Sequence, residues 1–382
     1  MAIENKAHTL EALLEQVQEH RRSQVDYIAP TGELQVVTEI KEGGNETNVI
    51  LEATGGAPTQ ILTANAVAFD QMASKAGIDI RTAKRFQQQY PYVLDHALNA
   101  IHLQEPRNAM LRTFDRGNNS GVLRAVVSDK FKTFDNSDVL ESVLPPLIES
   151  DAQWQIVNAA ITDKRLYARF KSLVITGQGK ALGDRMAQGV VISNSETGHG
   201  SVSVAQLIWT LVCLNGMQTQ NKSATAHLTS SRSDGDTWAL LTDESKRLDN
   251  AALSSKLTDV TAAYSSREMF ETVLEQFRHA AGDLVTNGMA AAQPAVEALG
   301  NVLKLSKAET SSVLDGLMQT IQQDGYRGEP LSRATLVNAV TAVANSSDAD
   351  SVSDWQSRGG RVLDLPANQW SSIASVPVAM AA

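Results

Sequence analysis

The sequence predicts an α+β protein with a central antiparallel sheet and a helical C-terminal region. Two observations carry this prediction. Between residues 108 and 217, apolar and polar residues alternate in short runs, as they do in half-buried strands. From about residue 222 to 325, apolar residues recur every three or four positions, as they do on amphipathic helices. The change of period places the sheet before most of the helices.

Residues 1–60 are expected to form an N-terminal arm of one helix and one hairpin. An apolar stripe predicts a helix over residues 5–22, and its members are Leu10, Leu13, Leu14 and Val17. Two strand-like runs, "GELQVVTEI" and "TNVILEAT", flank the turn-forming segment "KEGGNE". The pattern leaves open whether this arm is a separate domain or a contact to another subunit.

Residues 61–219 are expected to form the α+β core domain. Helical pieces over residues 64–104 come first, and glycine or proline ends each of them. The order that follows is strand, strand, helix, strand, strand, strand: "NAMLRTFD", "GVLRAVVSD", "NSDVLESVLPPLIES", "WQIVNAAIT", "RLYARFKSLVIT" and "RMAQGVVISNS". The segment "RGNNSG" between the first two strands predicts a hairpin. The next run, "GSVSVAQLIWTLVCLNGM", is apolar on both faces and fits a strand or a strand followed by a helix.

Residues 220–382 are expected to form the helical C-terminal region. The stretch "REMFETVLEQFRHAAGDLV" has a strong amphipathic pattern, and "KAETSSVLDGLMQTIQQDG" begins with a capping signature and ends at a glycine. A further helix is expected over "LSRATLVNAVTAVANSS". The small, apolar tail "SSIASVPVAMAA" is expected to be frayed and disordered.

The composition indicates a soluble protein of the cytoplasm. The single cysteine, Cys213, excludes an intrachain disulfide and a cysteine-rich zinc site. No apolar run is long enough to span a bilayer, and the N-terminus lacks the apolar core of a signal peptide. The seven histidines are scattered, and no motif for a metal or a nucleotide is present, so no cofactor is expected.

One predicted strand has several cations on its polar face, although an amphipathic strand needs only polar residues there. In "DKRLYARFKSLVIT", a period of two puts the apolar residues on one face and a basic group on the other: Arg165, Tyr167, Arg169 and Lys171. The net charge of −10 argues against a nucleic-acid ligand, but residues 61–219 carry 16 lysines and arginines against 14 acidic residues. Salt screens charges beyond roughly 10 Å, so a local basic face can act within an acidic chain.

The neighbouring hairpin and its exit segment add further cations to this pattern. They are Arg112, Arg124, Lys130 and Lys132. Phe131 and Phe134 lie among the lysines, and aromatic rings interleaved with cations suit stacking on bases and pairing with phosphates. The other interpretation, which the sequence leaves equally open, is that both rings belong to the core and the lysines are solvated.

The segment "NSETGHGS" contains the residue types of nucleophilic catalysis: Ser195, Glu196 and His199. It lacks the glycine pattern and the strand-to-helix elbow that expose a nucleophile. Asn, Ser and Gly are also the residues of an ordinary hairpin loop between two apolar strands. We therefore expect Ser195 and His199 to be loop residues without a catalytic contact.

Several ordered stretches resemble a known family. They are "MLRTFD", "LRAVVSDKFKTFDNSDVL", "GVVISNSETGHGSVSVAQLIWTLVCLNGM" and "TLVNAVTAVA". Together they resemble the phage/plasmid-like domain-of-unknown-function family, number nine-three-two, which is found in bacteriophages, plasmids and prophages. The resemblance covers roughly residues 62–345. It implies a phage context and no catalytic residue.

The predicted order of elements is also similar to the core of single-strand annealing proteins, which assemble into rings or helices around DNA. This analogy favours a phage-encoded protein of the host cytoplasm that binds single-stranded DNA, with strand annealing as a candidate activity and a homo-oligomeric ring or filament as its form. The alternative is a phage interaction protein, a regulator or host-defence antagonist, that binds through its acidic terminal segments. A third interpretation is an enzyme centred on Ser195, Glu196 and His199. No membrane partner is expected.

Overall fold

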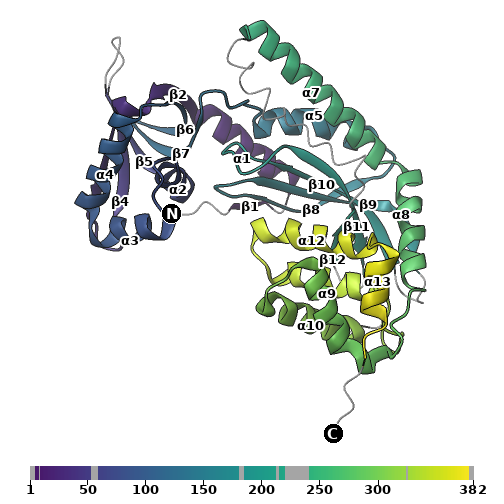
Figure 1. Ribbon diagram of the computed structural model, residues 1–382. Coiled ribbons are helices and arrows are strands. Elements are labelled where there is room, and N and C mark those ends of the chain that lie inside the picture. Colours follow the sequence, from purple (N-terminus) through teal and green to yellow (C-terminus); the bar gives the residue numbers. More distant parts are fainter. Residues whose placement is uncertain are drawn as a thin grey trace.

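The computed structural model describes residues 5–7, 9–52, 59–179, 185–211, 215–219, 241–323 and 326–377. These residues form a mixed α+β fold with two six-stranded sheets and a helical C-terminal region (Figure 1). Cys213, residues 220–240 at the start of the predicted helical region, and the last five residues of the tail lie outside the described ranges.

The first sheet lies in a lobe built from residues 24–128. Its strands occur in the order β2-β6-β7-β5-β4-β3. Their bounds are β2 (Gln24–Pro30), β3 (Leu34–Glu39), β4 (Glu46–Leu51), β5 (Gln60–Ala64), β6 (Asn108–Gly117) and β7 (Ser120–Ser128). Only β5 and β7 run parallel. The predicted hairpins β3–β4 and β6–β7 are both confirmed. At the tip of the second, Asn118 and Asn119 have φ of 53° and 55°, the left-handed conformation that a tight hairpin turn requires.

Three helices cover one face of the first sheet: α2 (Ala66–Lys75), α3 (Ile80–Gln89) and α4 (Pro91–Gln104). They match the three helical pieces that the sequence predicts. Apolar residues of the helices and the strands share one core, including Leu62, Leu94, Leu98, Leu111 and Leu123. A turn of 3₁₀-helix, η1 (Thr31–Glu33), joins β2 to β3.

Helix α4 also blocks the outer edge of β3. Asn99 accepts a hydrogen bond from Val36 N at 2.7 Å and donates one to Val36 O at 2.9 Å. One helical turn earlier, Asp95 accepts from Thr38 N at 2.8 Å. These side chains occupy backbone groups that an incoming strand would need, so this edge is closed to pairing with another chain.

The second sheet has the strand order β1-β8-β9-β10-β11-β12, and all of its pairs are antiparallel. Its strands are β1 (Asn5–Ala7), β8 (Trp154–Ile161), β9 (Leu166–Gln178), β10 (Arg185–Asn194), β11 (Ser203–Thr210) and β12 (Asn215–Gln218). The strands predicted over 154–194 are confirmed, and the run after them is a strand, β11. The beginning of the predicted N-terminal helix is instead the short edge strand β1.

Helices cover both faces of the second sheet. On one face lie α1 (Leu10–Ser23), α5 (Asn136–Glu149) and α7 (Asp243–Tyr264), whose apolar residues pack with Leu166, Ala168 and Phe170 of β9. On the other face, one of the C-terminal helices covers Arg169 of β9. The C-terminal helices together share a second core with Ile175, Met186 and Ile208. They are α8 (Arg267–Ala280), α9 (Ala292–Leu303), α10 (Lys307–Gln322), α11 (Arg333–Ala342), α12 (Ala349–Leu363) and α13 (Ala367–Ala374), with 3₁₀ turns η2 (Gly288–Ala291) and η3 (Val343–Ser346).

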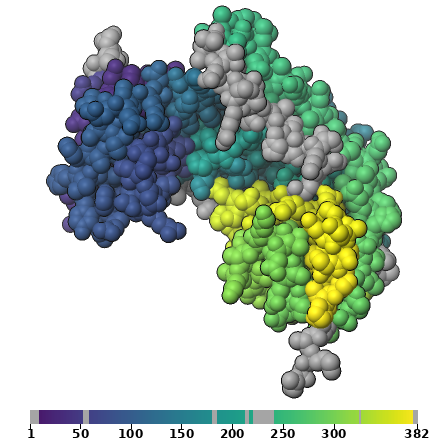
Figure 2. Space-filling model, viewed as in Figure 1, coloured from purple at the N-terminus to yellow at the C-terminus, as the bar shows by residue number. Residues whose placement is uncertain are grey.

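Figure 2 shows the purple and blue lobe of residues 24–128 standing apart from the yellow C-terminal helices, with the teal strands of the second sheet between them. Part of the segment expected to be frayed is ordered, because residues 371–374 end α13 and Ile373 is fully buried. Apolar packing against the rest of the helical region holds this turn in place.

The structure corrects the prediction of one central sheet. The hairpin β6–β7 belongs to the first sheet, whereas β8, β9 and β10 belong to the second. The strand order of single-strand annealing proteins is therefore not confirmed. The domain boundary predicted after residue 60 falls inside β5, which bonds to β4 on one side and β7 on the other. Residues on both sides of that boundary thus share one sheet.

An ion pair between α10 and α12 predicts a pH-dependent stability in the C-terminal region. Glu309 accepts a hydrogen bond from Ser306 N at 2.8 Å and pairs with Arg358 Nη1 at 2.8 Å. The Ser306 bond, and then Arg358, lower the pKa of Glu309 to about 2 from its ordinary 4.5. A lowered carboxyl pKa stabilises the fold above the ordinary value, and this stabilisation is lost as the pH falls toward the folded pKa.

We therefore expect Glu309→Ala to lower the free energy of unfolding by about 1 kcal/mol at pH 7, since solvent screens this partly exposed pair. The difference from the wild type should shrink as the pH falls from about 4.5 toward 2. Urea unfolding at a series of pH values measures it. A difference that stays constant over this range would contradict the prediction.

Candidate functional site

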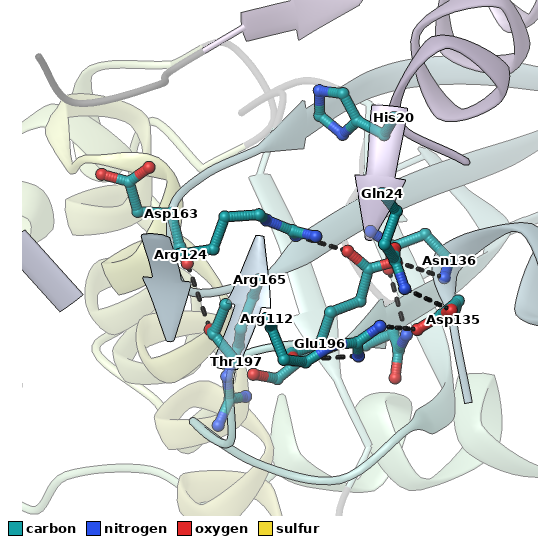
Figure 3. A network of polar contacts seen from close by, with 12 residues as sticks. His20, Gln24, Arg112, Arg124, Asp135, Asn136, Asp163, Arg165, Glu196 and Thr197 are labelled. Carbon is teal, nitrogen blue, oxygen red and sulfur yellow. Dashed lines mark hydrogen bonds and ion pairs between the residues drawn. The ribbon is translucent and has the colours of Figure 1, made fainter. Parts of the chain in front are cut away.

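Three of the four stretches that carry the family resemblance meet at one buried network of charges (Figure 3). Its five charged side chains come from five segments: β2, β6, β7, the residue that caps α5, and the loop after β10. They are Asp26, Arg112, Arg124, Asp135 and Glu196. The network lies where the lobe of the first sheet joins the second sheet, so we call it the interlobe network.

Arg112 is the centre of the interlobe network. Its side chain is fully buried, and it pairs through Nη2 with Asp135 Oδ1 at 2.7 Å and with Asp26 Oδ2 at 3.2 Å. Its Nη1 donates to the backbone oxygen of Glu196 at 3.1 Å. One guanidinium thus joins β6 to β2, to α5 and to the loop after β10.

Arg124 and Glu196 form the second ion pair of the interlobe network. Arg124 Nη2 and Glu196 Oε2 lie 2.5 Å apart, and both side chains are less than a tenth exposed. The other carboxylate oxygen of Glu196 accepts from Asn136 N, at the start of α5, at 2.8 Å. The guanidinium carbon of Arg124 also lies 3.9 Å from the ring centroid of Phe114, a cation–π contact.

Local sequence explains how these side chains are held. Asp135 directly precedes α5, and its backbone N–H donates to Asp138 at 2.9 Å, which begins the helix with a capping contact. Gln24 donates to Asp135 Oδ2 at 2.9 Å. Asn194 donates to Asn136 Oδ1 at 3.0 Å and so ties the end of β10 to the same helix end. Most oxygens of the network are therefore already occupied.

Burial and charge move the pKa values of the two inner carboxyl groups in opposite directions. Burial raises the pKa of Asp135, and the Arg112 guanidinium offsets this only in part. Burial acts in the same direction on Glu196, but Arg124 and the Asn136 N–H together hold the pKa of Glu196 below its ordinary value. Burial lowers the pKa of Arg112, but Asp135 and Asp26 more than compensate, and the net pKa is raised. Glu196 is thus the firmly ionised acid of the network.

His20 lies above the network, with its ring 4.7 Å from the ring of Phe114. Burial, and then Arg124, lower the pKa of His20, so this imidazole is neutral at pH 7. His20 Nδ1 and Arg124 Nη1 are buried and have no hydrogen-bond partner among the described residues.

Ser195 and His199 do not form a nucleophile and a base. Ser195 Oγ donates to Lys164 O at 2.7 Å and accepts from His199 N at 2.8 Å, so both contacts go to backbone atoms. The imidazole Nδ1 of His199 faces Thr197 Oγ1 at 3.3 Å. The prediction that both are loop residues is confirmed. The Glu196 carboxylate faces Arg124 instead, so the structure does not assemble the site that the third interpretation requires.

The loop also holds the lobes together through Gln71 of α2. Its side-chain nitrogen donates to Thr197 O at 2.7 Å, and its oxygen accepts from Val126 N at 2.7 Å. Together with the interlobe network, these contacts join the first sheet to the second. These hydrogen bonds and ion pairs form a polar interface between the two lobes.

The predicted basic face of β9 is not a solvent-facing surface. Tyr167 and Arg169 are 3% and 2% exposed, because α12 covers this face of the sheet. Lys171 is half-buried. Arg165 is half-buried as well, and its Nε donates to His199 O at 2.9 Å. The alternating pattern correctly separates the two faces of the strand, but a second layer of helices covers both of them.

The other four predicted binding residues are divided between two places. Arg112 and Arg124 lie in the interlobe network, where carboxylates of the chain itself occupy them. Lys132 is half-buried and pairs with Asp249 of α7, and Lys130 is half-buried beside β7. Because burial and internal ion pairs separate them, these eight residues do not form one exposed surface.

A different basic and aromatic surface lies on α3 and at the start of α4, and the sequence analysis missed it. Its members are Arg81, Lys84, Arg85, Tyr90 and Tyr92, all of them exposed. We call it the α3–α4 surface. The signal was present in "RTAKRFQQQYPY", where three cations at helical spacing precede two tyrosines.

Among the residues that the structure describes, no group of three or more His, Cys, Asp and Glu side chains could hold a metal ion. Over the same ranges, none of the helices has both the length and the apolar character that a membrane span requires.

Comparison with known proteins identifies a family for the central part of the chain. Residues 124–232 match the model of the family described as "Domain of unknown function (DUF932)". The match confirms the family that the sequence resembles, over the segment that contains Arg124, Asp135 and Glu196. No curated protein and no solved structure matches the chain.

Proposed function

We propose that this protein, whose residues 124–232 match the DUF932 family, binds single-stranded DNA through the α3–α4 surface. The observation that carries the proposal is the grouping of three exposed cations and two exposed tyrosines within twelve residues of sequence. Cations pair with phosphates, and aromatic rings stack on bases of any sequence, so this combination suits a single strand.

Helical spacing puts the three cations together. Arg81, Lys84 and Arg85 lie three and four positions apart on α3, so they share one side of the helix. Lys84 Nζ pairs with Asp70 of α2 at 2.9 Å, with half of the lysine side chain still exposed. An exposed pair of this kind is weak, and a phosphate can replace the carboxylate at little cost.

The two tyrosines extend the surface past the end of α3. Tyr92 is 78% exposed and Tyr90 is 49% exposed. The guanidinium carbon of Arg85 lies 5.8 Å from the ring centroid of Tyr90, so a cation and a ring already lie side by side. Large aromatic side chains that remain exposed to this degree are typical of surfaces that bind a partner.

The framework beneath this surface is rigid. The C-terminal end of α3 is tied to the loop between β3 and β4, where Asn45 donates to Gln87 O at 2.8 Å and Gln87 donates to Thr47 Oγ1 at 2.9 Å. Ordered supports of this kind keep the cations and rings at fixed separations. A preformed surface loses less conformational entropy when a ligand binds.

The proposal also includes the origin, the location, the annealing activity and the self-assembly that the sequence predicts. We propose a phage-encoded protein of the bacterial cytoplasm that anneals complementary strands while several subunits hold them extended. An open strand edge supports self-assembly: β1 pairs with β8 only over residues 159–161, which leaves residues 154–158 without a strand on that side among the described residues. An assembly would repeat the α3–α4 surface and multiply weak contacts.

Binding to a fluorescein-labelled single-stranded oligonucleotide, measured by anisotropy at low salt, tests the proposal. We expect the triple variant Arg81→Ala/Lys84→Ala/Arg85→Ala to bind at least about 30-fold more weakly, since it removes three phosphate contacts. The slope of log K against log salt should fall in magnitude by about 2, because each single-strand contact contributes about 0.7. Tyr92→Ala should weaken binding by about tenfold through lost stacking.

The matched control removes the same charge from exposed positions of α7 and α8. It is Arg247→Ala/Lys256→Ala/Arg267→Ala. We expect it to change the affinity by less than about twofold at moderate salt. Equal losses in both triple variants would indicate a diffuse charge effect and contradict the α3–α4 surface. A wild-type protein that binds no oligonucleotide would favour the interaction-protein alternative.

Multi-angle light scattering tests the proposed assembly. We expect the full chain of 41.1 kDa to elute at a mass several times that value, and the mass to rise or sharpen with single-stranded DNA. A monomer at all concentrations, with and without DNA, would contradict annealing.

A further inference from the structure

A cavity of about 340 Å³ lies between the second sheet and the N-terminal end of α12. Strands β8, β9, β11 and β12 form its floor, and η3 and α12 form its roof. The residues that matter to its chemistry are Asn158, Arg169, Trp209, Ala349 and Gln356. It lies in a different part of the molecule from the interlobe network and from the α3–α4 surface.

Arg169 lines this cavity and is only 2% exposed. Its guanidinium donates to Asn158 Oδ1 at 3.2 Å, to Ser353 Oγ at 2.7 Å and to Gln356 Oε1 at 3.2 Å. All three partners are neutral. No carboxylate of the described residues forms an ion pair with it, in contrast to the buried Arg112 and Arg124.

The contacts of Arg169 leave part of its guanidinium available. The group has five N–H donors, and the three hydrogen bonds use one each on Nε, Nη1 and Nη2. One donor remains on Nη1 and one on Nη2. Donors on the two Nη atoms of one guanidinium can bind two oxygens of one phosphate or carboxylate.

A buried charge without a counter-charge is costly, because neutral partners do not replace the hydration of the ion. Burial lowers the pKa of Arg169 to about 10, the direction expected when the charged form lacks an anion. Asp350, in the first turn of α12, does not supply one. Asp350 accepts from Thr162 Oγ1 at 3.0 Å, and its charge raises the pKa of Tyr167.

The helix that forms the roof adds a second feature that favours an anion. The first residue of α12, Ala349, lines the cavity, and the N-terminal end of a helix of 15 residues carries partial positive charge. Asp348 caps this end, where its carboxylate accepts from Ser351 N at 3.0 Å and from Ser351 Oγ at 2.9 Å. The indole of Trp209 is held by its bond to Phe170 O at 3.1 Å and offers an apolar wall.

We propose that this cavity binds a small phosphate-bearing anion, with Arg169 as the residue that grips the phosphate oxygens. The α12 N-terminus and the amides of Asn158 and Gln356 complete the polar surround, and Trp209 forms the apolar side. The ligand is inorganic phosphate or the phosphate of a mononucleotide, which share this chemistry. The inference does not depend on the binding of single-stranded DNA.

Isothermal titration calorimetry of the full chain with inorganic phosphate, and separately with adenosine monophosphate, tests the proposal. We expect Arg169→Gln to weaken binding by at least about tenfold, since a charge-assisted bidentate contact is lost. Ala349→Phe keeps Arg169 and fills the cavity instead, and we expect it to abolish binding. The control Arg185→Gln removes an exposed arginine of the same sheet and should bind like the wild type.

Binding of phosphate alone to the wild type, with loss in both cavity variants, supports the free ion as ligand. Binding of the mononucleotide without inorganic phosphate, with the same losses, supports a nucleotide. Absence of binding of both probes at 10 mM, about the limit for a useful site, would overturn the proposal. Unchanged binding in Ala349→Phe would overturn it as well, even if Arg169→Gln fails to fold. Oligonucleotide binding by Ala349→Phe should equal that of the wild type.

Discussion

The variant Arg112→Met is expected to lower the free energy of unfolding by about 3–5 kcal/mol at pH 7. Methionine fills much of the same volume, so the loss is chiefly electrostatic. Without the guanidinium, Asp135 and Asp26 lose their buried counter-charge, and Glu196 O loses its hydrogen bond. Urea unfolding followed by circular dichroism measures the loss.

The loss of unfolding free energy in Arg112→Met should become smaller as the pH falls. Burial already raises the pKa of Asp135, and loss of Arg112 raises it further. A carboxyl group whose folded pKa is raised destabilises the fold above that pKa and ceases to do so once it is protonated. In the wild type, the lowered pKa of Glu196 has the opposite consequence, since its stabilisation is lost as the pH falls. Because Arg124 still pairs with Glu196 in the variant, the Glu196 effect is largely common to both proteins, and protonation of Asp135 is what narrows the difference between variant and wild type toward low pH.

The matched control is Arg21→Met. Arg21 pairs with Glu141 at 2.7 Å, the same distance as the closest contact of Arg112, but both side chains are more than half exposed. We expect a change of no more than about 0.5 kcal/mol at any pH. A deficit for Arg112→Met that is as small as the control, or that grows as the pH falls from 7 to 4, would contradict the ionic role assigned to the interlobe network.

The second large effect is expected for Glu196→Gln, at about 3–4 kcal/mol. Glutamine keeps the acceptor for Asn136 N, but it leaves the guanidinium of Arg124 buried without a carboxylate. Burial of an unpaired charge accounts for most of the cost. Thermal and urea unfolding of the variant measure it.

A second substitution separates charge from shape. The double variant Glu196→Gln/Arg124→Met removes both charges of the pair, and we expect it to regain at least about 1 kcal/mol relative to Glu196→Gln. The exposed Glu141→Gln serves as the control for loss of a glutamate charge. If the double variant is less stable than either single variant, the contribution of Arg124 lies in its contact with Phe114 rather than in the ion pair.

The sequence by itself determined the local elements and their order. Hairpins such as β6–β7 and helices such as α5 follow from alternation, turn residues and capping residues that lie within a few positions of one another. The separation of Leu166, Ala168 and Phe170 from the other face of β9 has the same origin. Four of the five charged residues of the interlobe network also stand out in the sequence, because Arg112, Arg124, Asp135 and Glu196 lie in the stretches that carry the family resemblance.

Only the tertiary structure decided what each face meets. The period of β9 shows that Arg169 and Tyr167 share a face, but it carries no information about α12, which lies some 180 residues later and covers them. The same holds for the division into two sheets, since strand pairing depends on contacts across long stretches of chain. A cation in an alternating pattern therefore has two physical outcomes. It faces water when nothing packs on its side of the sheet, and it becomes a buried, partnered charge when a later helix does.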